Sequence, residues 1–270
     1  MTIQQPSSAD WTLFLRWAGQ EGWRVPCKEQ LLFQHQWRPF FFALRHGGAT
    51  RGFVSAVGYR HSGWIGNLLI DPQHRGQGYG KRLLEEALNF LNQRQLKHIW
   101  LTASDQGAPL YQRYGFNQID TVTRWSTIGN GGDCGQMAEV QATLNCLIAL
   151  EQDCWGEDRR DLIQALALES TLLQQPNHLA LLQAGLDVWQ LGPWSAVKTD
   201  PRSARLLLDA AVAATPADKS LFVDILDSAG LELLLRQSGF IRQGHNKLMY
   251  QGETPRLRNV MALASFGSIG

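Results

Sequence analysis

The stretch "LLIDPQHRGQGYGKRLL", residues 68–84, joins an apolar run to a helix-like run through three glycines in five positions. The preceding "GWIGNLLI" (63–70) is apolar almost throughout, which is typical of a strand covered on both faces. From Tyr79 to Arg94 apolar residues recur at helical spacing, which predicts a long helix. A glycine loop between a buried strand and a helix is typical of phosphate-binding sites, because backbone amides can approach an anion closely there.

Two well-known phosphate-binding patterns do not fit this loop. A Walker A loop needs glycine five residues before its Gly-Lys pair and Ser or Thr after it, but these positions hold Arg75 and Arg82. The dinucleotide pattern places a glycine where this chain has Lys81, and no acidic ribose partner follows about 20 residues on. On the loop alone, a strand-to-helix turn without a ligand stays an alternative.

The segments around the loop predict an α/β plan. The predicted elements are a helix over 8–22, a hairpin of strands 40–46 and 50–60, a buried strand over 98–104, a short helix over 108–114 and a closing strand over 117–126. This order of strands, helix, strand, helix and strand requires at least one parallel crossover.

The stretch "GNGGDCG", residues 129–135, carries four glycines and no apolar periodicity, which is typical of a linker. It predicts a first domain over 1–128, a glycine-rich linker over 129–138 and a second domain over 139–270. The second half is expected to contain helices over 157–170, 201–214 and 231–237, and strands over 179–185, 186–197, 220–226 and 246–252.

That order of elements repeats the first half. Gly115-Phe116 recurs as Gly239-Phe240, 124 residues further on, and the leucine pair that begins at Leu83 recurs at Leu207 with the same offset. The buried strands that begin at Ile99 and Leu221 are offset by 122 residues. Near-constant offsets across unequal loops predict an internal duplication of one domain.

The amino-acid composition limits the kinds of binding partner that are expected. The chain has 270 residues, 44% hydrophobic and 18% charged, with a formal net charge of +1, so nucleic acid and anionic membrane are not expected as main partners. The N-terminal residues lack the pattern of a signal peptide, and no apolar run approaches the ~18 residues of a membrane span, so we expect a cytoplasmic protein. Four cysteines and seven histidines are scattered, so no metal site is predicted.

Two motifs together resemble a known family. Arg75-x-x-Gly78-x-Gly80, led by Asp71-Pro72, resembles the coenzyme A pyrophosphate loop of the GNAT acyltransferase superfamily, and "APLYQRYGF" (108–116) is similar to its closing segment. The resemblance covers about residues 8–126. Less specific matches, "EGW" (21–23), "LGPW" (191–194) and "ALASFGSIG" (262–270), resemble tandem bacterial proteins in which a divergent acetyltransferase-like domain follows the first.

The resemblance implies an α/β (α+β) fold of two GNAT-like domains, each a mixed, mostly antiparallel twisted sheet with a central parallel strand pair and flanking helices. It implies an acyl-CoA-dependent N-acyltransferase, which passes acetyl from acetyl-CoA to a primary amine of a small molecule or peptide by direct transfer in a ternary complex. It implies no metal, and a monomer or homodimer is expected. The alternative is a non-catalytic acyl-CoA-binding sensor or scaffold.

The resemblance also implies roles for individual residues. Tyr111 is expected to act as general acid toward the departing thiolate, and the amide of Leu69 or Ile70 is expected to polarise the thioester carbonyl. The implied coenzyme-binding residues are Leu68, Leu69, Ile70, His74, Arg75, Gly76, Gln77, Gly78, Tyr79, Gly80, Lys81, Ser104 and Tyr111.

A general base is harder to assign from the sequence. Many relatives carry a glutamate on the strand before the loop, but "WIGNLLI" (64–70) has none. The candidates are therefore Asp105, His61 and Glu21, with Asp120 less favoured.

The second half lacks both signature groups. Its counterpart of the loop, "KTDPRSARLLL" (198–208), has no glycine, so side chains would block close approach to a phosphate. Leu235 stands where Tyr111 stands in the first half. The second domain is therefore predicted not to bind coenzyme A.

Overall fold

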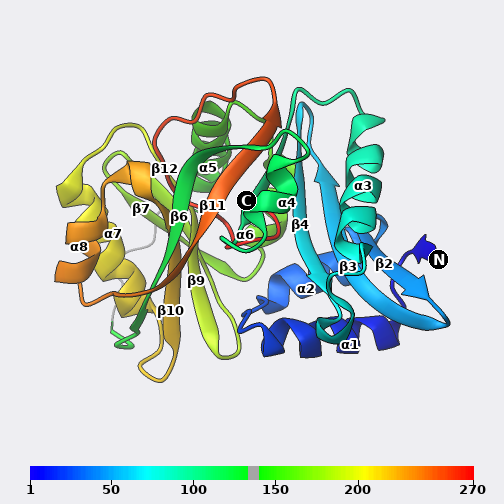
Figure 1. Ribbon diagram of the computed structural model, residues 1–270. Helices are drawn as coiled ribbons and strands as arrows, with labels where there is room; N and C mark the ends of the chain where they lie inside the picture. Colours follow the sequence, from blue (N-terminus) through cyan, green and yellow to red (C-terminus); the bar gives the residue numbers. More distant parts are fainter. Residues whose placement is uncertain (133–139) are drawn as a thin grey trace. The chain divides into compact units, whose positions relative to one another are not determined.

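A computed structural model describes residues 1–132 and 140–270 (Figure 1). Most of the predicted linker lies outside the described residues. The chain forms two compact units: the first contains Met1–Leu101 and Gly267–Ile269, and the second contains Thr102–Phe266 and Gly270. The division falls inside strand β5 (His98–Ala103).

The first unit is built on strands β1 (Thr2–Gln4), β2 (Phe41–His46), β3 (Ala49–Gly58), β4 (Ser62–Ile70) and β5, which lie side by side in chain order. The pairs β1–β2, β2–β3 and β3–β4 are antiparallel, and β4–β5 is parallel. The predicted hairpin and the predicted parallel pair are both confirmed, and the mixed α/β class with them.

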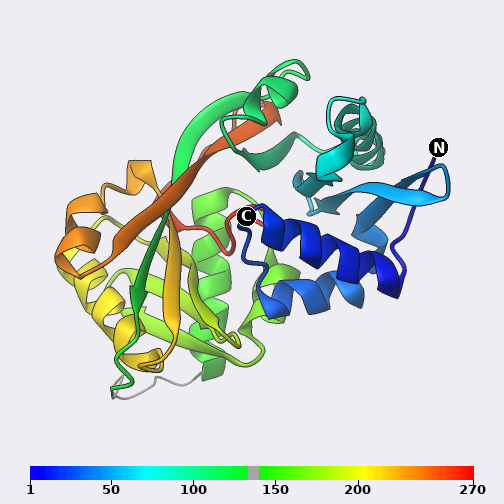
Figure 2. The ribbon, with the colours of Figure 1, turned by 60° about the horizontal axis from the view of Figure 1, so that its bottom comes forward.

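Helices cover both faces of this sheet (Figure 2). Helix α3 (Tyr79–Asn92) covers one face, where a side chain at Gly52 or Gly63 would meet Leu83 or Leu91. Helix α1 (Ser8–Gln20) packs on the other face, where the ring of Phe14 contacts Phe53 edge to face. The predicted apolar side of α3 is buried, whereas helix α2 (Cys27–Gln34) and the short 3-10 turns η1 (Arg38–Phe40) and η2 (Pro72–His74) were not predicted.

Asp10 ties α1 to the β2–β3 hairpin. It closes a capping box with Ser7 and accepts hydrogen bonds from the Thr50 hydroxyl at 2.6 Å and from Arg45 at 2.7 Å. Burial raises the pKa of this carboxyl, but the hydrogen bonds from Ser7, Thr50 and Arg45 together outweigh burial and lower its pKa to about 2.

The strands of the second unit lie in the order β11-β6-β10-β12-β9-β8-β7, and β10 also pairs with β9. Its strands are β6 (Asn117–Ile128), β7 (Ser170–Gln175), β8 (His178–Gln183), β9 (Val188–Ala196), β10 (Ser220–Leu226), β11 (Ile241–Gly252) and β12 (Val260–Ala262). Its helices are α4 (Ala108–Gln112), α5 (Val140–Trp155), α6 (Arg160–Ala167), α7 (Pro201–Ala214) and α8 (Glu232–Gln237), with a 3-10 turn η3 (Asp227–Ala229).

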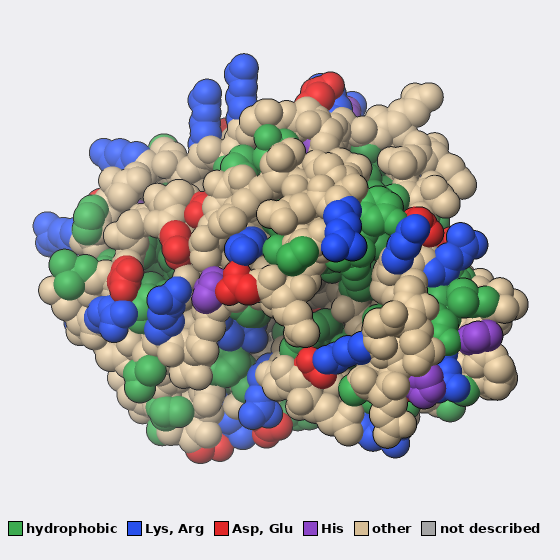
Figure 3. Space-filling view, in the orientation of Figure 1, with side chains coloured by type: hydrophobic (Ala, Val, Ile, Leu, Met, Phe, Trp, Pro, Cys, Tyr) green, Lys and Arg blue, Asp and Glu red, His purple; other side chains and the backbone are tan. Residues whose placement is uncertain are grey.

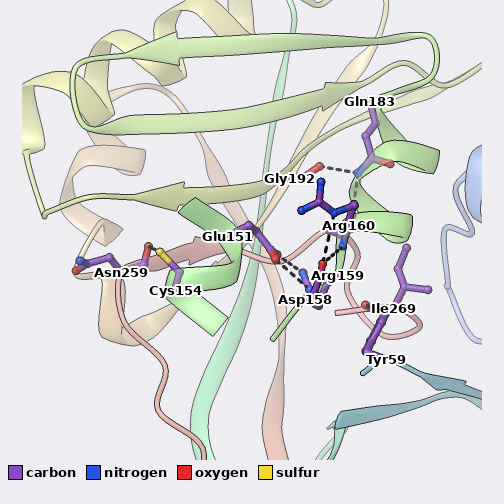
Figure 4. Close-up of polar contacts among 11 residues, drawn as sticks. Tyr59, Glu151, Cys154, Asp158, Arg159, Arg160, Gln183, Gly192, Asn259 and Ile269 are labelled. Carbon is purple, nitrogen blue, oxygen red and sulfur yellow. Dashed lines mark hydrogen bonds and ion pairs between the residues drawn. The ribbon is translucent and has the colours of Figure 1, made fainter. Parts of the chain in front are cut away.

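Helix α5 and strands β7 and β12 of the second unit were not predicted. Helix α5 starts close to the predicted linker, although its buried Leu147, Ile148, Glu151 and Trp155 have helical spacing. The helix predicted over 157–170 is shorter, because β7 begins at Ser170. A buried ion pair between Glu151 and Arg159 joins α5 to the residue before α6 (Figure 4). Strand β12 has only three residues.

A β-bulge in the first unit has a counterpart in the second unit. Asn67 and Leu68 on β4 oppose the single residue Val54 on β3, which makes a β-bulge. On β8 and β9 the same irregularity places two residues, 192 and 193, opposite Leu181. Both bulges lie on the strand before the loop or its counterpart, which supports the internal duplication.

Strand β6 lies between two strands of the second half. It pairs antiparallel with β10 and with β11, and Arg124 on β6 is the direct partner of Asp224 on β10. The sequence predicted β6 as the closing strand of the first domain. Duplicated halves carry equivalent strands, so a strand of one half can take its place beside strands of the other. The compact units therefore divide the chain before β6, and the boundary at 129–138 stays a prediction about the sequence repeat.

The surface carries both signs of charge. Basic and acidic side chains are mixed over the face drawn in Figure 3, as the net charge of +1 leads one to expect. No helix within the described residues is long and apolar enough to cross a membrane. The cytoplasmic location and the oligomeric state stay predictions.

Candidate active site

The glycine loop leads from β4 into α3. Gly76 and Gly78 have φ angles of 77° and 82°, in the left-handed region where residues with a side chain are strained. Gly78 is the N-cap of α3, and no side chain caps this helix. The first helical hydrogen bond runs from the Arg82 amide to the Gly78 carbonyl, so the amides of residues 79–81 have no partner within the helix.

The charged side chains of the loop already have partners. Arg75 forms an ion pair with Glu21 at 2.5 Å, and His74 lies 2.7 Å from the carboxylate of Asp71. Lys81 lies 3.8 Å from Glu85, one helical turn further on, and both Gln77 and Arg75 are exposed. The loop therefore holds exposed cations beside an open helix N-terminus, which together favour an anion.

Tyr79 is held in a different way. Its side chain is buried, and its hydroxyl lies 2.7 Å from Nδ1 of His46 on β2. This contact fixes the first residue of α3 to the hairpin. Tyr79 can therefore serve an anion only through its backbone amide.

The end of β4 presents backbone groups away from β3. The Asp71 amide donates to the Arg51 carbonyl at 3.0 Å, in the same register as the pairs Gly52–Ile70 and Phe53–Leu69. Antiparallel pairs alternate between hydrogen-bonded and non-bonded, so the Leu69 amide faces β3 and the Ile70 amide faces away from it. The pairing of β4 with β5 covers only Ser62–Trp64 within the described residues, so the amide of Ile70 is not used by that ladder.

Asn67 shapes the bulge on this strand. It has a φ of 53°, a left-handed conformation that Asn adopts more readily than most residues. Its side-chain amide is buried and donates to the Ser55 hydroxyl at 3.2 Å. Asn67 therefore has a structural role at the bulge.

Tyr111 lies on α4 in the second unit and is buried, with its ring edge to face with Phe116 at 6.0 Å. Gly115 has a φ of 80°, and the Phe116 amide donates to the Tyr111 carbonyl at 3.2 Å, so Gly115 ends the helix in a left-handed conformation. Burial raises the pKa of the Tyr111 hydroxyl, which is protonated at neutral pH. Within the described residues this hydroxyl has no hydrogen-bond partner.

Ser104 follows β5 and belongs to a turn. Its hydroxyl accepts a hydrogen bond from the Gly107 amide at 3.2 Å, and its carbonyl accepts the amides of Gly107 and Ala108. Its side chain is exposed. The turn positions the start of α4 and so the helix that carries Tyr111.

The base candidates lie in separate places. Glu21 pairs with Arg75 at the loop. Asp105 pairs with Lys247 at 2.9 Å and His245 at 3.3 Å, and the hydrogen bond from Lys247 is the main cause that lowers its pKa. A lowered pKa makes Asp105 a weak base.

The other two candidates, His61 and Asp120, have different surroundings. His61 is exposed and precedes β4, whereas the loop follows this strand. Eight residues of strand from His61 to Leu69 span about 26 Å, so His61 lies far from the loop. Asp120 accepts hydrogen bonds from the hydroxyl and the amide of Ser228, at 2.5 and 3.3 Å.

The counterpart of the loop in the second unit is closed. Asp200 caps α7, and its side chain accepts the amides of Arg202 and Ser203. A side chain therefore occupies the place where α3 offers open amides. Leu235, which stands in the position of Tyr111, is fully buried.

Strand β12 fills the space between β9 and β10. These two strands pair in parallel from Val188–Ser220 to Leu191–Val223 and then separate. Beyond that point Ala262 of β12 pairs with Ile225 on β10 and with Trp194 on β9. Sequence reasoning missed β12, because three apolar residues near the end of the chain give no strand pattern.

The described residues contain no group of three His, Cys, Asp or Glu side chains that could hold a metal ion. The first unit therefore contains a glycine loop with an open helix end and a bulged strand with an outward amide. The second unit contains a buried tyrosine on a short helix.

Comparison with protein families gives a match for the first part of the chain. Residues 9–116 match the Acetyltransferase (GNAT) family, and this match includes the loop, β4 and Tyr111. Streptothricin acetyltransferase of Streptomyces lavendulae is 37% identical over 84 residues, which are 28% of this chain and 43% of that protein. The ribosomal protein bS18 alanine N-acetyltransferase of Escherichia coli is 27% identical over 109 residues, 39% of this chain and 73% of that protein.

Solved structures extend the similarity in fold to the whole chain. A putative acetyltransferase from Pyrococcus horikoshii has a TM-score of 0.80 and 18% identity, with 100% of this chain and 94% of that chain covered. A GCN5-related N-acetyltransferase from Sphaerobacter thermophilus has a TM-score of 0.66 and 11% identity, with 96% of each chain covered. The family match covers residues 9–116, less than half of the chain, and over the rest of the chain the similarity is one of fold. The chain spans less than half the length of the first curated relatives.

Proposed function

We propose that the protein transfers an acyl group, most simply acetyl, from acetyl-CoA to a primary amine. The observation that carries this proposal is the loop Arg75–Gly80, which opens the uncapped N-terminus of α3 directly after a buried strand, inside the segment that matches the GNAT family. Coenzyme A has the diphosphate that such a loop holds through backbone amides.

The coenzyme would be held by its diphosphate and by its arm. The amides of residues 79–81 face the phosphates, and Arg75 and Lys81 add positive charge. The arm runs back along β4, where the Ile70 amide rather than the Leu69 amide is directed away from β3. We assign to Ile70 the hydrogen bond to the thioester end of the arm.

The reaction needs a deprotonated amine and a protonated leaving group. An amine of pKa ~10.4 must lose a proton at a cost of roughly 4–5 kcal/mol at pH 7, or bind already neutral. Tyr111 is protonated at neutral pH and supplies the proton or hydrogen bond for the departing thiolate. The pKa of Asp105 is lowered by its hydrogen bond from Lys247, and Glu21 and Asp120 are held by Arg75 and Ser228, so we assign proton removal to a water relay.

The second half would not bind the coenzyme. Asp200 blocks the helix end with its own side chain, β12 fills the space between β9 and β10, and Leu235 replaces the tyrosine. The second half instead supplies strands that pair with β6.

The acceptor is a primary amine of a small molecule or a peptide. Two relatives carry names of both kinds, one acting on streptothricin and one on the alanine of a ribosomal protein. Neither name assigns the acceptor of this chain.

Coenzyme binding and turnover test the proposal separately. Saturation with coenzyme A at 100 times its Kd stabilises a binding protein by about 2.7 kcal/mol, which is measurable as a rise in Tm. Gly78→Glu places a side chain and a negative charge in the loop and should abolish this rise. Gly156→Glu is the matched control, because Gly156 also has a positive φ of 66° with open space around it. A rise that persists in Gly78→Glu contradicts the proposed loop.

Measurement of turnover distinguishes an enzyme from a sensor. Thiol release from acetyl-CoA in the presence of a panel of amines should fall by ~10²-fold or more in Tyr111→Phe, while coenzyme affinity changes little. The pairing of the base candidate Asp105 with Lys247 and His245 favours the alternative of an acyl-CoA sensor. Tight binding with no thiol release for any amine would support the sensor.

A further inference from the structure

The chain returns to the first unit at its far end. Residues Gly267–Ile269, here named the returning segment, belong to the compact first unit although the residues before them belong to the second. Ser268 and Ile269 are 3% and 1% exposed. The Tyr59 hydroxyl, between β3 and β4, donates to the Ile269 carbonyl at 3.0 Å (Figure 4). A segment buried and bonded in this way is a fixed part of the first unit.

The returning segment lies against β4 at Gly66. A Cβ added at Gly66 would come within 2.6 Å of the Ser268 Cα, 2.7 Å of the Ser268 carbonyl oxygen and 2.8 Å of the Gly267 carbonyl oxygen. These are backbone atoms, which cannot turn aside as the end of a side chain can. Glycine at position 66 is therefore required by the close approach of two backbones.

The contact is on the face of β4 opposite α3. A Cβ at Gly63 would meet Leu91 of α3, and successive residues of a strand point to opposite faces. Gly66 is three residues further on, before the bulge at Asn67 and Leu68, so it points to the other face. The returning segment therefore covers this face beside the bulge.

The two substrates must reach the thioester from different sides. A coenzyme held at the N-terminus of α3 takes the α3 side of β4, and its arm extends from the loop toward Leu68 and the bulge. The amine then has to approach from the opposite face, because direct transfer needs both reactants within about 3–3.5 Å along separate paths. That face is where the returning segment lies.

We infer that the returning segment forms the acceptor-side wall of the acetyl-transfer site, where it limits the size of the amine and shields the thioester from water. This inference rests on the proposed function. Gly267 is the partly exposed residue of the segment, and a peptide carbonyl has two lone pairs that can accept an amine N–H. The wall selects slender primary amines over bulky ones.

Gly66→Ala tests the wall directly. The added methyl group displaces the returning segment. Gly58→Ala is the control, because its methyl group meets the flexible side chain of Arg94 at 2.9 Å and makes an ordinary contact with Leu91 at 3.9 Å. Tyr59→Phe loosens the segment by removal of one hydrogen bond and leaves Gly66 unchanged. It keeps the test decisive if Gly66→Ala does not fold.

The probes are water, methylamine and benzylamine. We expect acceptor-free thiol release from acetyl-CoA to rise at least threefold in Gly66→Ala and in Tyr59→Phe, and the ratio of benzylamine to methylamine turnover to rise by a similar factor. The Kd for coenzyme A should change less than twofold, and Gly58→Ala should match the wild type. Unchanged hydrolysis with an unchanged ratio overturns the inference, as does a parallel loss of coenzyme affinity. Failure of the wild type to bind coenzyme A would overturn the proposed function instead.

Discussion

The ion pair between Arg124 and Asp224 fastens β6 to β10. Asp224 is fully buried and accepts hydrogen bonds from Nε and a terminal nitrogen of Arg124 at 2.7 and 2.8 Å, and from Gln190 at 3.1 Å. Asp224→Asn keeps the size but removes the charge, and it turns one acceptor into a donor that faces a donor. The guanidinium is then left uncompensated with its side chain only 12% exposed.

Removal of one partner of a buried ion pair costs about 3–5 kcal/mol of unfolding free energy. Because Arg124 keeps some contact with water, we expect a loss near the lower end, about 3 kcal/mol. Replacement of both partners, Arg124→Met with Asp224→Leu, should cost about 1 kcal/mol or less, since no charge is left unpaired.

Urea unfolding followed by tryptophan fluorescence measures these differences. Asp209→Asn is the matched control, because Asp209 forms an exposed pair with Arg205 on α7, and such pairs contribute about 0.5 kcal/mol or less. The reasoning is refuted if Asp224→Asn costs less than about 1 kcal/mol, or no more than the exposed control.

Three further expectations follow from single side chains. The Asp10 pKa of about 2 lies below its value in the unfolded chain, so its contribution to the free energy of unfolding is present above about pH 4 and lost as the pH falls toward 2. After solvent screening this contribution amounts to about 1–2 kcal/mol. Asp10→Asn should remove it, as measured by urea unfolding. Glu21→Gln frees Arg75 from its ion pair and should raise coenzyme A affinity about threefold by calorimetry, which an unchanged Kd would contradict. Burial raises the pKa of the Cys154 thiol to about 11, so iodoacetamide at pH 8 should label the exposed Cys27 and not Cys154 in peptide mass maps; labelling of both at equal rates would contradict this.

Local patterns were enough to predict much of the first unit. The apolar period of α3, the alternation and turn of the β2–β3 hairpin, and the glycines before α3 all depend on residues close in sequence. Helix α7 was predicted with its observed bounds for the same reason. These are the cases in which a short segment already contains its own structural information.

Other features depend on distant segments and were not predictable. The pairing of β6 with β10 joins residues about 100 positions apart, and both halves offer a strand of similar pattern. The requirement for glycine at position 66 arises from Ser268, which the neighbourhood of Gly66 does not reveal. Helix α5 is different, because its spacing was a signal that the adjacent glycine-rich stretch obscured.

The general base also could not be assigned from local sequence. Asp105, His61 and Glu21 were candidates because the strand before the loop has no glutamate. The structure pairs Asp105 with Lys247 and places His61 at the far end of β4. Only contacts made in three dimensions decide which carboxylate keeps an unpaired, basic form.

Strand β12 would compete with a coenzyme for the space between β9 and β10. A coenzyme arm that sought the space between β9 and β10 would have to displace a strand of the same molecule, tethered only a few residues away. A segment so tethered acts at an effective concentration of about millimolar or more, and it is never diluted. We therefore expect the space between β9 and β10 to stay filled by the chain's own peptide at any cellular concentration of coenzyme.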